Sequence, residues 1–272
     1  RSEMCIRDRN ERVRQRLLES GVDALLAEHM AHLFVRDPLV IFSENINLND
    51  TRSMDHFENI QSTNWQTMRF KPPPHGGHTG WRVEFRSMEI QLTDFENAAF
   101  CIFLVLLSRV IMTMPVDFGM PISLVDVNMQ RAQRRDAIHS QRFHFRSSRH
   151  TSQTQEYTLA DIFHGSAGDD TMPGLLPLVH SYLDSLNMSE TERQRLNRYL
   201  DLVAMRVDGR LMSTATYIRQ FVQQHPAYRH DSVVSDEINY DLLCTLDRIE
   251  RGEYEVPDFM PAWFAAYRRE RK

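Results

Sequence analysis

Charged and aromatic side chains alternate along two short segments that could form neighbouring β-strands. Every second residue of a strand points to the same face, so the odd positions of 65–71 share one face and the even positions of 81–86 share another. Besides Thr67, those positions hold Trp65, Arg69, Lys71, Arg82, Glu84 and Arg86. Charge of this density is costly to place beside a core. It therefore predicts either a solvated row of ion pairs or a site for charged ligands.

The chemistry available to such a row is the handling of a metal ion and a phosphate. A carboxylate such as that of Glu84 can hold a hard divalent cation, and a guanidinium such as that of Arg86 can hold phosphate oxygens in a two-pronged hydrogen bond. From the alternation alone, the structural ion-pair row remains the more ordinary interpretation. For Trp65, Arg69 and Lys71, packing against the sheet and exposure to solvent are likewise the ordinary interpretations.

Long stretches of the chain resemble one enzyme family. FENIQSTNWQ, MRFKPPP, GWRVEFR and MEIQLTDFENAAF surround the two strands, and LLAEHMAHLFVRDPLVIF precedes them. Further matching text is PGLLPLVHSYL, GRLMSTATYIRQFVQQHPAY and HDSVVSDEINYDLL, so that the resemblance runs from about Arg14 to Leu243. The sequence is similar to the catalytic subunit of eukaryotic glutamate–cysteine ligase (γ-glutamylcysteine synthetase).

The resemblance implies a fold, a reaction and a set of partners. The expected fold class is α+β of the glutamine synthetase-like superfamily, with part of a curved antiparallel sheet followed by a mostly helical C-terminal region. The expected reaction joins the γ-carboxylate of L-glutamate to the amine of L-cysteine through a γ-glutamyl phosphate, with ATP as substrate and Mg²⁺ as cofactor. A regulatory (modifier) subunit is a further expected partner.

The resemblance also implies roles for individual residues. Glu84 is expected to bind the metal, and Arg86 is expected to contact the transferred phosphate as a catalytic residue. Trp65 would line the amino-acid pocket, while Arg69 and Lys71 would supply positive charge for carboxylate or phosphate. Ser87 stands where the family usually has proline, which changes the stiffness of the backbone beside the site.

The bulk composition is that of an ordinary globular protein. The 272 residues carry a net charge of −5, which gives no electrostatic case for binding nucleic acid or a membrane surface. Three cysteines without a CxxC spacing suit a reducing cytoplasm, and Cys101 lies in an apolar run typical of buried cysteines. Neither a Walker A loop nor a dinucleotide glycine fingerprint is present, so ATP would bind through another kind of site.

Four segments are expected along the chain. Residues 1–9 do not resemble the family and are interpreted as foreign or disordered, and the chain as a C-terminal fragment that is inactive alone. Residues 10–145 would be part of the catalytic domain, 146–156 a flexible loop, and 157–272 a helical region. The alternative function is a non-catalytic helical interaction module or a degenerate paralogue of the enzyme.

Apolar periodicity and capping residues predict the helices. One broad apolar face covers 11–34, with a kink or a break at Gly21, and 46–58 is expected to be loop. Thr93 and Glu96 form a capping box ahead of an apolar run, 98–114, that is expected to be a buried core helix too short to span a bilayer. Further helices are expected over 123–138, 175–186, 189–207, 214–224 and 235–251.

Two other groups contain residue types that can form sites. The pairs His29/His32 and His75/His78 lack further ligands at zinc-like spacing and receive no function. A basic region between 131 and 149 is either a solvated face or a contact for nucleotide phosphate. Its members are Arg131, Arg134, Arg135, Arg142, Arg146 and Arg149.

Overall fold

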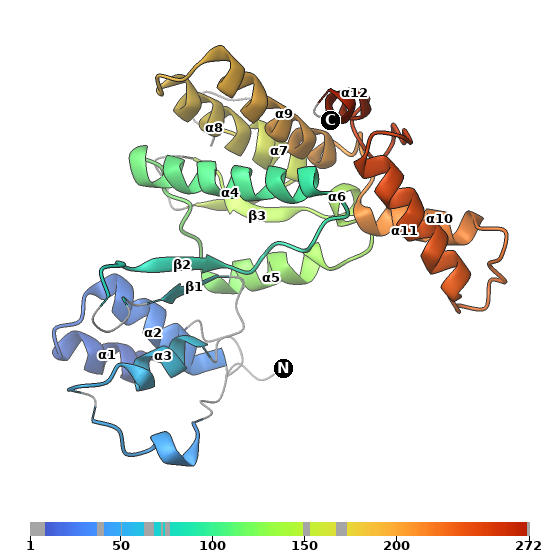
Figure 1. The fold of residues 1–272 in the computed structure, drawn as a ribbon. Helices are drawn as coiled ribbons and strands as arrows, with labels where there is room; N and C mark the ends of the chain where they lie inside the picture. Colours follow the sequence, from blue (N-terminus) through green and yellow to red (C-terminus); the bar gives the residue numbers. More distant parts are fainter. Residues whose placement is uncertain are drawn as a thin grey trace. The chain divides into compact units, whose positions relative to one another are not determined.

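The protein divides into two compact units, which are described separately. The computed structural model describes residues 9–36, 41–49, 51–62, 68–71, 73, 77–148, 153–166 and 173–270. Unit 1 is Arg1–Glu89 and unit 2 is Ile90–Lys272. Helices dominate the described residues, and the two sheets found there are two-stranded and antiparallel (Figure 1). The fold is therefore α+β and mostly helical, as the sequence predicts.

Unit 1 begins with two helices that pack on one another. α1 (Glu11–Glu19) is capped by the Asn10 side chain, and α2 is Ala24–Arg36. The chain breaks between them at Gly21, whose φ of +83° is a left-handed conformation that glycine adopts at little cost. Of the two sequence-based alternatives, a break is thus correct and a kink within one helix is wrong.

A third helix and a strand pair complete unit 1. α3 (Asp55–Ser62) follows a short 3₁₀ turn, η2 (Ser43–Asn45), so the prediction of loop over 46–58 is wrong at its C-terminal end. Acidic residues in the first turn of α3 favour its N-terminus. β1 (Met68–Lys71) and β2 (Arg82–Phe85) then pair antiparallel. The predicted strands are confirmed; β2 is shorter than its charged segment, and residues 65–67 of the first segment lie outside the described residues.

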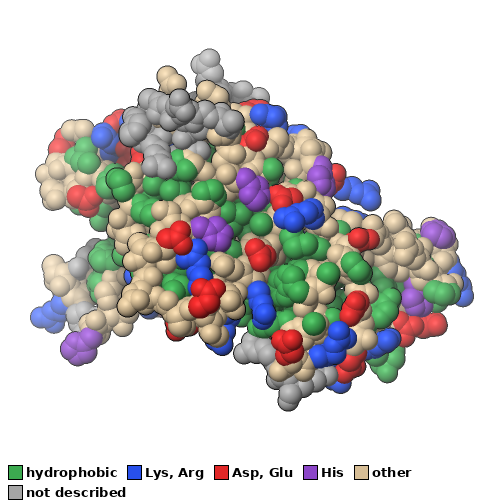
Figure 2. All heavy atoms as spheres, turned by 90° about the horizontal axis from the view of Figure 1, so that it is seen from above, with side chains coloured by type: hydrophobic (Ala, Val, Ile, Leu, Met, Phe, Trp, Pro, Cys, Tyr) green, Lys and Arg blue, Asp and Glu red, His purple; other side chains and the backbone are tan. Residues whose placement is uncertain are grey.

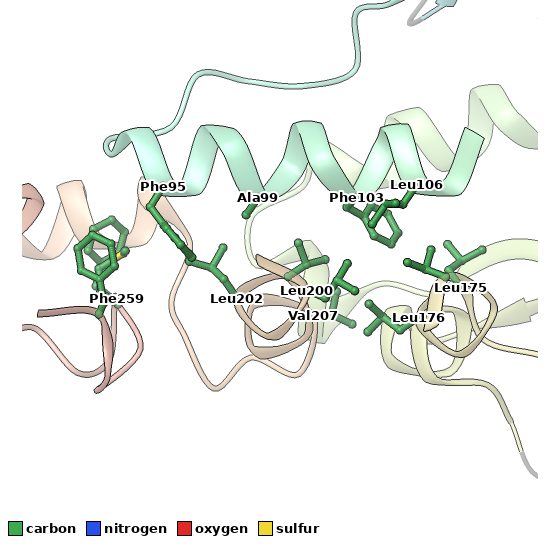
Figure 3. Packing of buried hydrophobic residues seen from close by; sticks show 14 of the residues in the cluster. Phe95, Ala99, Phe103, Leu106, Leu175, Leu176, Leu200, Leu202, Val207 and Phe259 are labelled. Carbon is green, nitrogen blue, oxygen red and sulfur yellow. The ribbon is translucent and has the colours of Figure 1, made fainter. Parts of the chain in front are cut away.

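Unit 2 is organised around the long helix α4 (Asp94–Thr113). Thr93 Oγ1 accepts from the Glu96 N–H at 3.2 Å, and Glu96 Oε2 accepts from the Thr93 N–H at 3.2 Å, which confirms the predicted capping box. One stripe of α4 is buried, and Figure 3 shows its side chains pointing toward residues of α8 (Leu175–Asp184) and α9 (Glu190–Val207). The buried apolar residues of that stripe are Phe95, Ala99, Phe103, Leu106 and Val110.

Two expectations about α4 are wrong. The helix begins directly after its predicted cap, Thr93, but its 20 residues make it long and apolar enough for a membrane span by length and composition, so the expectation that it is too short is wrong. Nor is it buried all round, because Val105 is 59% and Met112 74% exposed. Cys101 is exposed as well. It follows buried Ala99 by two residues, and a step of two residues turns about 200° around the helix, to the opposite side. α4 is a core helix on one side only.

A strand pair that the sequence reading missed lies beyond α4. α5 (Ile122–Ala132) begins after Pro121, so the predicted cap at Ser123 is wrong, and a left-handed turn at Asp136 separates it from α6 (Ala137–Ser140). β3 (Phe143–Arg146) and β4 (Thr154–Tyr157) then pair antiparallel. The predicted loop over 146–156 therefore contains the end of one strand and most of another.

The C-terminal part is helical, as predicted. Two left-handed glycines, Gly209 and Gly252, follow α9 and α11 and stop these helices where the sequence indicates. Besides α8 and α9, its elements are α7 (Leu159–His164), α10 (Thr214–Gln224), α11 (Asp236–Glu250) and α12 (Phe264–Arg269).

A buried ion pair fastens α4 to α9 within the core. Arg206 Nη2 donates to Glu96 Oε1 at 2.6 Å, and both residues are buried. The Arg206 guanidinium also lies 4.7 Å from the centre of the Phe259 ring. Burial lowers the pKa of Arg206, although the charge of Glu96 opposes that shift. Because Glu96 also closes the capping box, one carboxylate both starts α4 and joins it to α9.

Candidate functional site

The candidate site lies on the β1–β2 hairpin of unit 1. In the register of the pair, Arg69 is opposite Glu84 and Lys71 is opposite Arg82. Directly opposed residues of an antiparallel pair occupy the same side of the sheet. Arg69, Lys71, Arg82 and Glu84 therefore share one face of the hairpin. Alternation within each segment could not show that the two sets lie on the same face.

Glu84 is the centre of this face. Lys71 Nζ makes an ion pair with Glu84 Oε2, and Arg86 Nε donates to Glu84 Oε1. Lys71 reaches Glu84 diagonally, because its direct partner is Arg82. Each carboxylate oxygen therefore has its own cation, and the three side chains that sequence reasoning selected are brought together.

The site is partly open to solvent. The side chains of Glu84, Arg86 and Lys71 are 27%, 29% and 38% exposed. At such exposure each ion pair stabilises the fold by only about 0–1 kcal/mol, because water screens the charges. The row therefore contributes little to folding, and its charges are accessible to ligands.

The remaining predicted residues are less fully placed. Trp65 lies outside the described residues, and Arg69 is described by its backbone position alone. Beside the face, the ring of Trp81 meets that of Phe57 of α3 edge-on, with centroids 6.1 Å apart. That contact ties the start of β2 to α3, within unit 1.

The donor set fits part of a magnesium site. Mg²⁺ is bound in proteins by one or two carboxylates together with water and substrate phosphate, so Glu84 can supply one ligand. Within the part of the chain that the structure describes, no three His, Cys, Asp or Glu residues gather closely enough to hold a metal. A complete site with several carboxylates would therefore need ligands from elsewhere.

The basic region between 131 and 149 separates into two groups. Arg131 donates to Glu156 Oε1 at 2.7 Å, Arg142 to the Glu156 carbonyl at 2.8 Å, and buried Arg146 to the Gly119 carbonyl at 3.0 Å. These three arginines hold α5, β3, β4 and the preceding loop together. Arg134 and Arg135 lie apart from them in the turn after α5, and Arg149 is outside the described residues.

Charges of both signs are mixed on the surface drawn in Figure 2. Acidic and basic side chains lie next to one another there, with hydrophobic side chains between them. Such mixing is typical of a solvated protein surface. A solvated surface accounts for these charges. It does not account for arginines that line a cavity.

Most of the chain, including the hairpin, matches one protein family. A family model for glutamate–cysteine ligase matches residues 6–249. The chain is 47% identical to the glutamate–cysteine ligase catalytic subunit of Rattus norvegicus over 270 residues, which is 92% of this chain and 42% of the rat protein. It is 47% identical to the glutamate–cysteine ligase of Schizosaccharomyces pombe over 254 residues, covering 90% of this chain and 38% of that protein.

The human catalytic subunit is similar to the same extent. It is 44% identical over 275 residues, which is 94% of this chain and 43% of the human protein. The chain thus spans about two fifths of the length of these relatives. Since the family model covers most of the chain and relatives from mammals and yeast agree with it, the chain belongs to the glutamate–cysteine ligase family.

Proposed function

We propose that this chain is part of the catalytic domain of a glutamate–cysteine ligase. The complete enzyme would use ATP to join the L-glutamate γ-carboxylate to the L-cysteine amine, the first step of glutathione biosynthesis. Support comes from the family match together with one observation in the structure. Glu84, Lys71 and Arg86 converge on an accessible sheet face where they add little to stability.

Each residue of the face has a distinct role in this proposal. Glu84 would be one ligand of Mg²⁺, which neutralises charge on the phosphoryl group that moves from ATP to glutamate. Arg86 would bind the equatorial oxygens of that group through its planar guanidinium. Lys71 and Arg69 would add positive charge for substrate carboxylate or phosphate, and Trp65 would line the amino-acid pocket.

The two cations now paired with Glu84 are part of the mechanism. They hold the carboxylate in position while no ligand is bound, because each cation contacts one of its two oxygens. When a phosphate arrives, Arg86 can exchange the carboxylate for phosphate oxygens without moving far along the strand. Glu84 would then be the residue that holds the cation that accompanies ATP.

Several broader features belong to the same proposal. We place the hairpin in a curved antiparallel sheet of the glutamine synthetase-like kind, whose other strands would supply further carboxylates for the metal. A modifier subunit would be a partner of the complete enzyme. The protein would act in the cytoplasm, in keeping with three cysteines and no CxxC spacing.

The test is Glu84→Gln in the complete enzyme. The amide is nearly isosteric, so the melting temperature should stay close to that of the wild type, while the weakened metal ligand should lower kcat by about 100-fold or more. Raising the magnesium concentration should restore part of the rate. Glu89→Gln is the matched control, because it removes the same charge five residues away. A Glu84→Gln enzyme with wild-type kcat at low magnesium would refute the assignment of Glu84.

A further inference from the structure

A cleft in unit 2 is large enough for a small molecule. Its volume is about 660 Å³, within the range of small-molecule sites. The turn between α5 and α6 forms one wall, and the segment from Gly209 to Arg219 of α10 forms the other. Two other cavities of unit 2, of about 40 and 10 Å³, hold at most water.

Positive charge predominates in this cleft. Arg134 and Arg135 line it from the first wall, and Arg219 of α10 lines it from the second. Its other titratable groups are Asp136 and His139, whose Oδ1 and Nδ1 atoms are 2.7 Å apart. Three guanidinium groups therefore face one carboxylate. The first turn of α10 adds the partial positive charge of a helix N-terminus.

Two of these guanidiniums have no competing protein ligand. Within the described part of the chain, Arg135 and Arg219 make no side-chain hydrogen bond or ion pair. Arg134 makes a single one, to Gln141 Oε1 at 3.1 Å. By contrast, the neighbouring Arg131, Arg142 and Arg146 are all engaged by protein acceptors. Among the described arginines of the basic region between 131 and 149, those with open donors are the ones that line the cleft.

The two walls are held together by a close contact between His139 and Gly209. Gly209 has a φ of +70°, and a Cβ atom at this position would lie 2.0 Å from His139 Nε2. The imidazole therefore occupies the space that any larger residue would fill. Asp136, itself at a left-handed φ of 54°, orients that ring. The cleft thus has a wall of defined position, and apolar Ile138, Leu211 and Met212 line it as well.

We propose that this cleft binds a phosphate-bearing small molecule. A phosphate monoester carries nearly two negative charges at neutral pH, which match the excess positive charge of the cleft. Its oxygens accept two-pronged hydrogen bonds from guanidiniums such as those of Arg135 and Arg219. The apolar wall would contact the organic part of the ligand. A nucleotide and a smaller phosphorylated metabolite share this chemistry.

Titration calorimetry on the chain tests the proposal with two probes, inorganic phosphate and ADP without magnesium. The cleft variant is Arg135→Ala/Arg219→Ala, which removes two exposed charges and should leave the melting temperature unchanged. The matched control is Arg12→Ala/Arg195→Ala, which removes two exposed charges from α1 and α9. The cleft variant should raise the Kd for both probes by about tenfold or more, and the control should not.

The outcomes distinguish a nucleotide from a smaller phosphate compound, and binding in the cleft from binding at the hairpin. Tighter binding of ADP than of phosphate, lost in the cleft variant, identifies a nucleotide, whereas equal binding identifies a smaller phosphate compound. Equal losses in the cleft and control variants would overturn the proposal. A third variant, Arg86→Ala, separates the hairpin from the cleft. If it abolishes ADP binding that the cleft variant retains, the cleft proposal fails while the proposed function stands.

Discussion

At the scale of single residues, Arg86 and Lys71 are not equivalent partners of Glu84. Both are cations, and both contact the same carboxylate. A guanidinium presents several N–H donors in one plane, whereas an ammonium is a compact point charge. Only Arg86 can therefore bind two oxygens of a phosphoryl group in parallel. The choice of arginine next to the carboxylate, and lysine across the strand, fits a phosphate on the β2 side.

Arg86→Lys tests this difference in the complete enzyme. The charge is kept, so the fold and the pairing with Glu84 should persist, but kcat should fall by roughly 10- to 100-fold because the two-pronged geometry is lost. Steady-state kinetics with ATP as the varied substrate measures the effect. Arg82→Lys, at the first residue of β2, is the control. Equal rates for wild type and Arg86→Lys would mean that only charge is required there.

Glu250 is a residue whose ionisation costs stability. Both of its carboxylate oxygens are buried without a hydrogen bond, although Arg268 Nη2 lies 2.6 Å from Oε1. Burial raises the pKa of Glu250, and the attraction of Arg268 opposes that shift. A raised carboxyl pKa means that the folded state binds the proton more tightly. The resulting stabilisation is present below the ordinary carboxyl pKa and is lost as the pH rises through the folded value.

Glu250→Gln should remove this pH dependence. The free energy of unfolding of the wild type, minus that of the variant, should increase as the pH is lowered from 7 toward the ordinary glutamate pKa of about 4.3. Urea melts at several pH values measure the difference, which cancels the titration of groups that do not interact with Glu250. A difference that stays constant across this range would show that ionised Glu250 carries no burial cost.

At the scale of elements, local chemistry decides what can be predicted. The caps at Thr93, Ser189 and Ser235 and the stop at Gly252 follow from residues within one helical turn, so the sequence indicates them directly. β3 and β4 are not evident from the sequence because each has only four residues. In FHFR the apolar alternation of Phe143 and Phe145 is too short to be distinguished from loop, and TQEY is mostly polar. Their pairing depends on tertiary contacts.

The pairing of residues far apart in the sequence could not be predicted, either in the site or in the core. Strand alternation selected Lys71, Glu84 and Arg86, but only the observed register brings Lys71 to Glu84. The pairing of Arg206 with Glu96 joins residues 110 positions apart. Likewise, Arg219 and Arg134 line the same cleft without any local signal in the sequence. Periodicity ranks residues within an element but does not choose partners between elements.

The stripe along α4 yields a prediction for the core. Leu106 is 9% exposed and lies among buried residues of α4 and α8 (Figure 3). Leu106→Ala should therefore lower the free energy of unfolding by about 2–4 kcal/mol, through lost burial and a residual cavity. Val105→Ala, one residue away and 59% exposed, should change it by less than about 0.5 kcal/mol. Equal shifts in denaturant melts would contradict the stripe.

At the scale of the whole molecule, the two units differ in how much core they contain. The buried hydrophobic residues found in unit 1 are Ala27, Met30 and Ala31, whereas the main core cluster belongs entirely to unit 2. Small buried areas give small stabilisation, at about 25 cal/mol per Å². The candidate site residues Lys71, Glu84 and Arg86 thus lie in the unit whose described residues form the smaller core.

The chain by itself should show no ligase turnover. Glu84 supplies one carboxylate, and no metal-binding group of three residues exists among the described positions. Charge on a transferred phosphoryl group would therefore be only partly neutralised. The measurement is ADP release with glutamate, cysteine, ATP and magnesium, with the complete enzyme as positive control. Turnover that requires both amino acids would show that the chain is catalytically sufficient.

The carboxylate of Glu96 sets a rule for building chimaeras of this enzyme family. It accepts hydrogen bonds from Thr93 at the start of α4 and from Arg206 in α9. In a chimaera, the two helices should therefore come from the same parent or from parents that both carry the pair. A crossover between positions 96 and 206 works when both parents carry the pair. A parent with an apolar residue at either position would leave the other charge buried and alone, at a cost of about 3–5 kcal/mol. Crossovers outside this interval carry the pair intact.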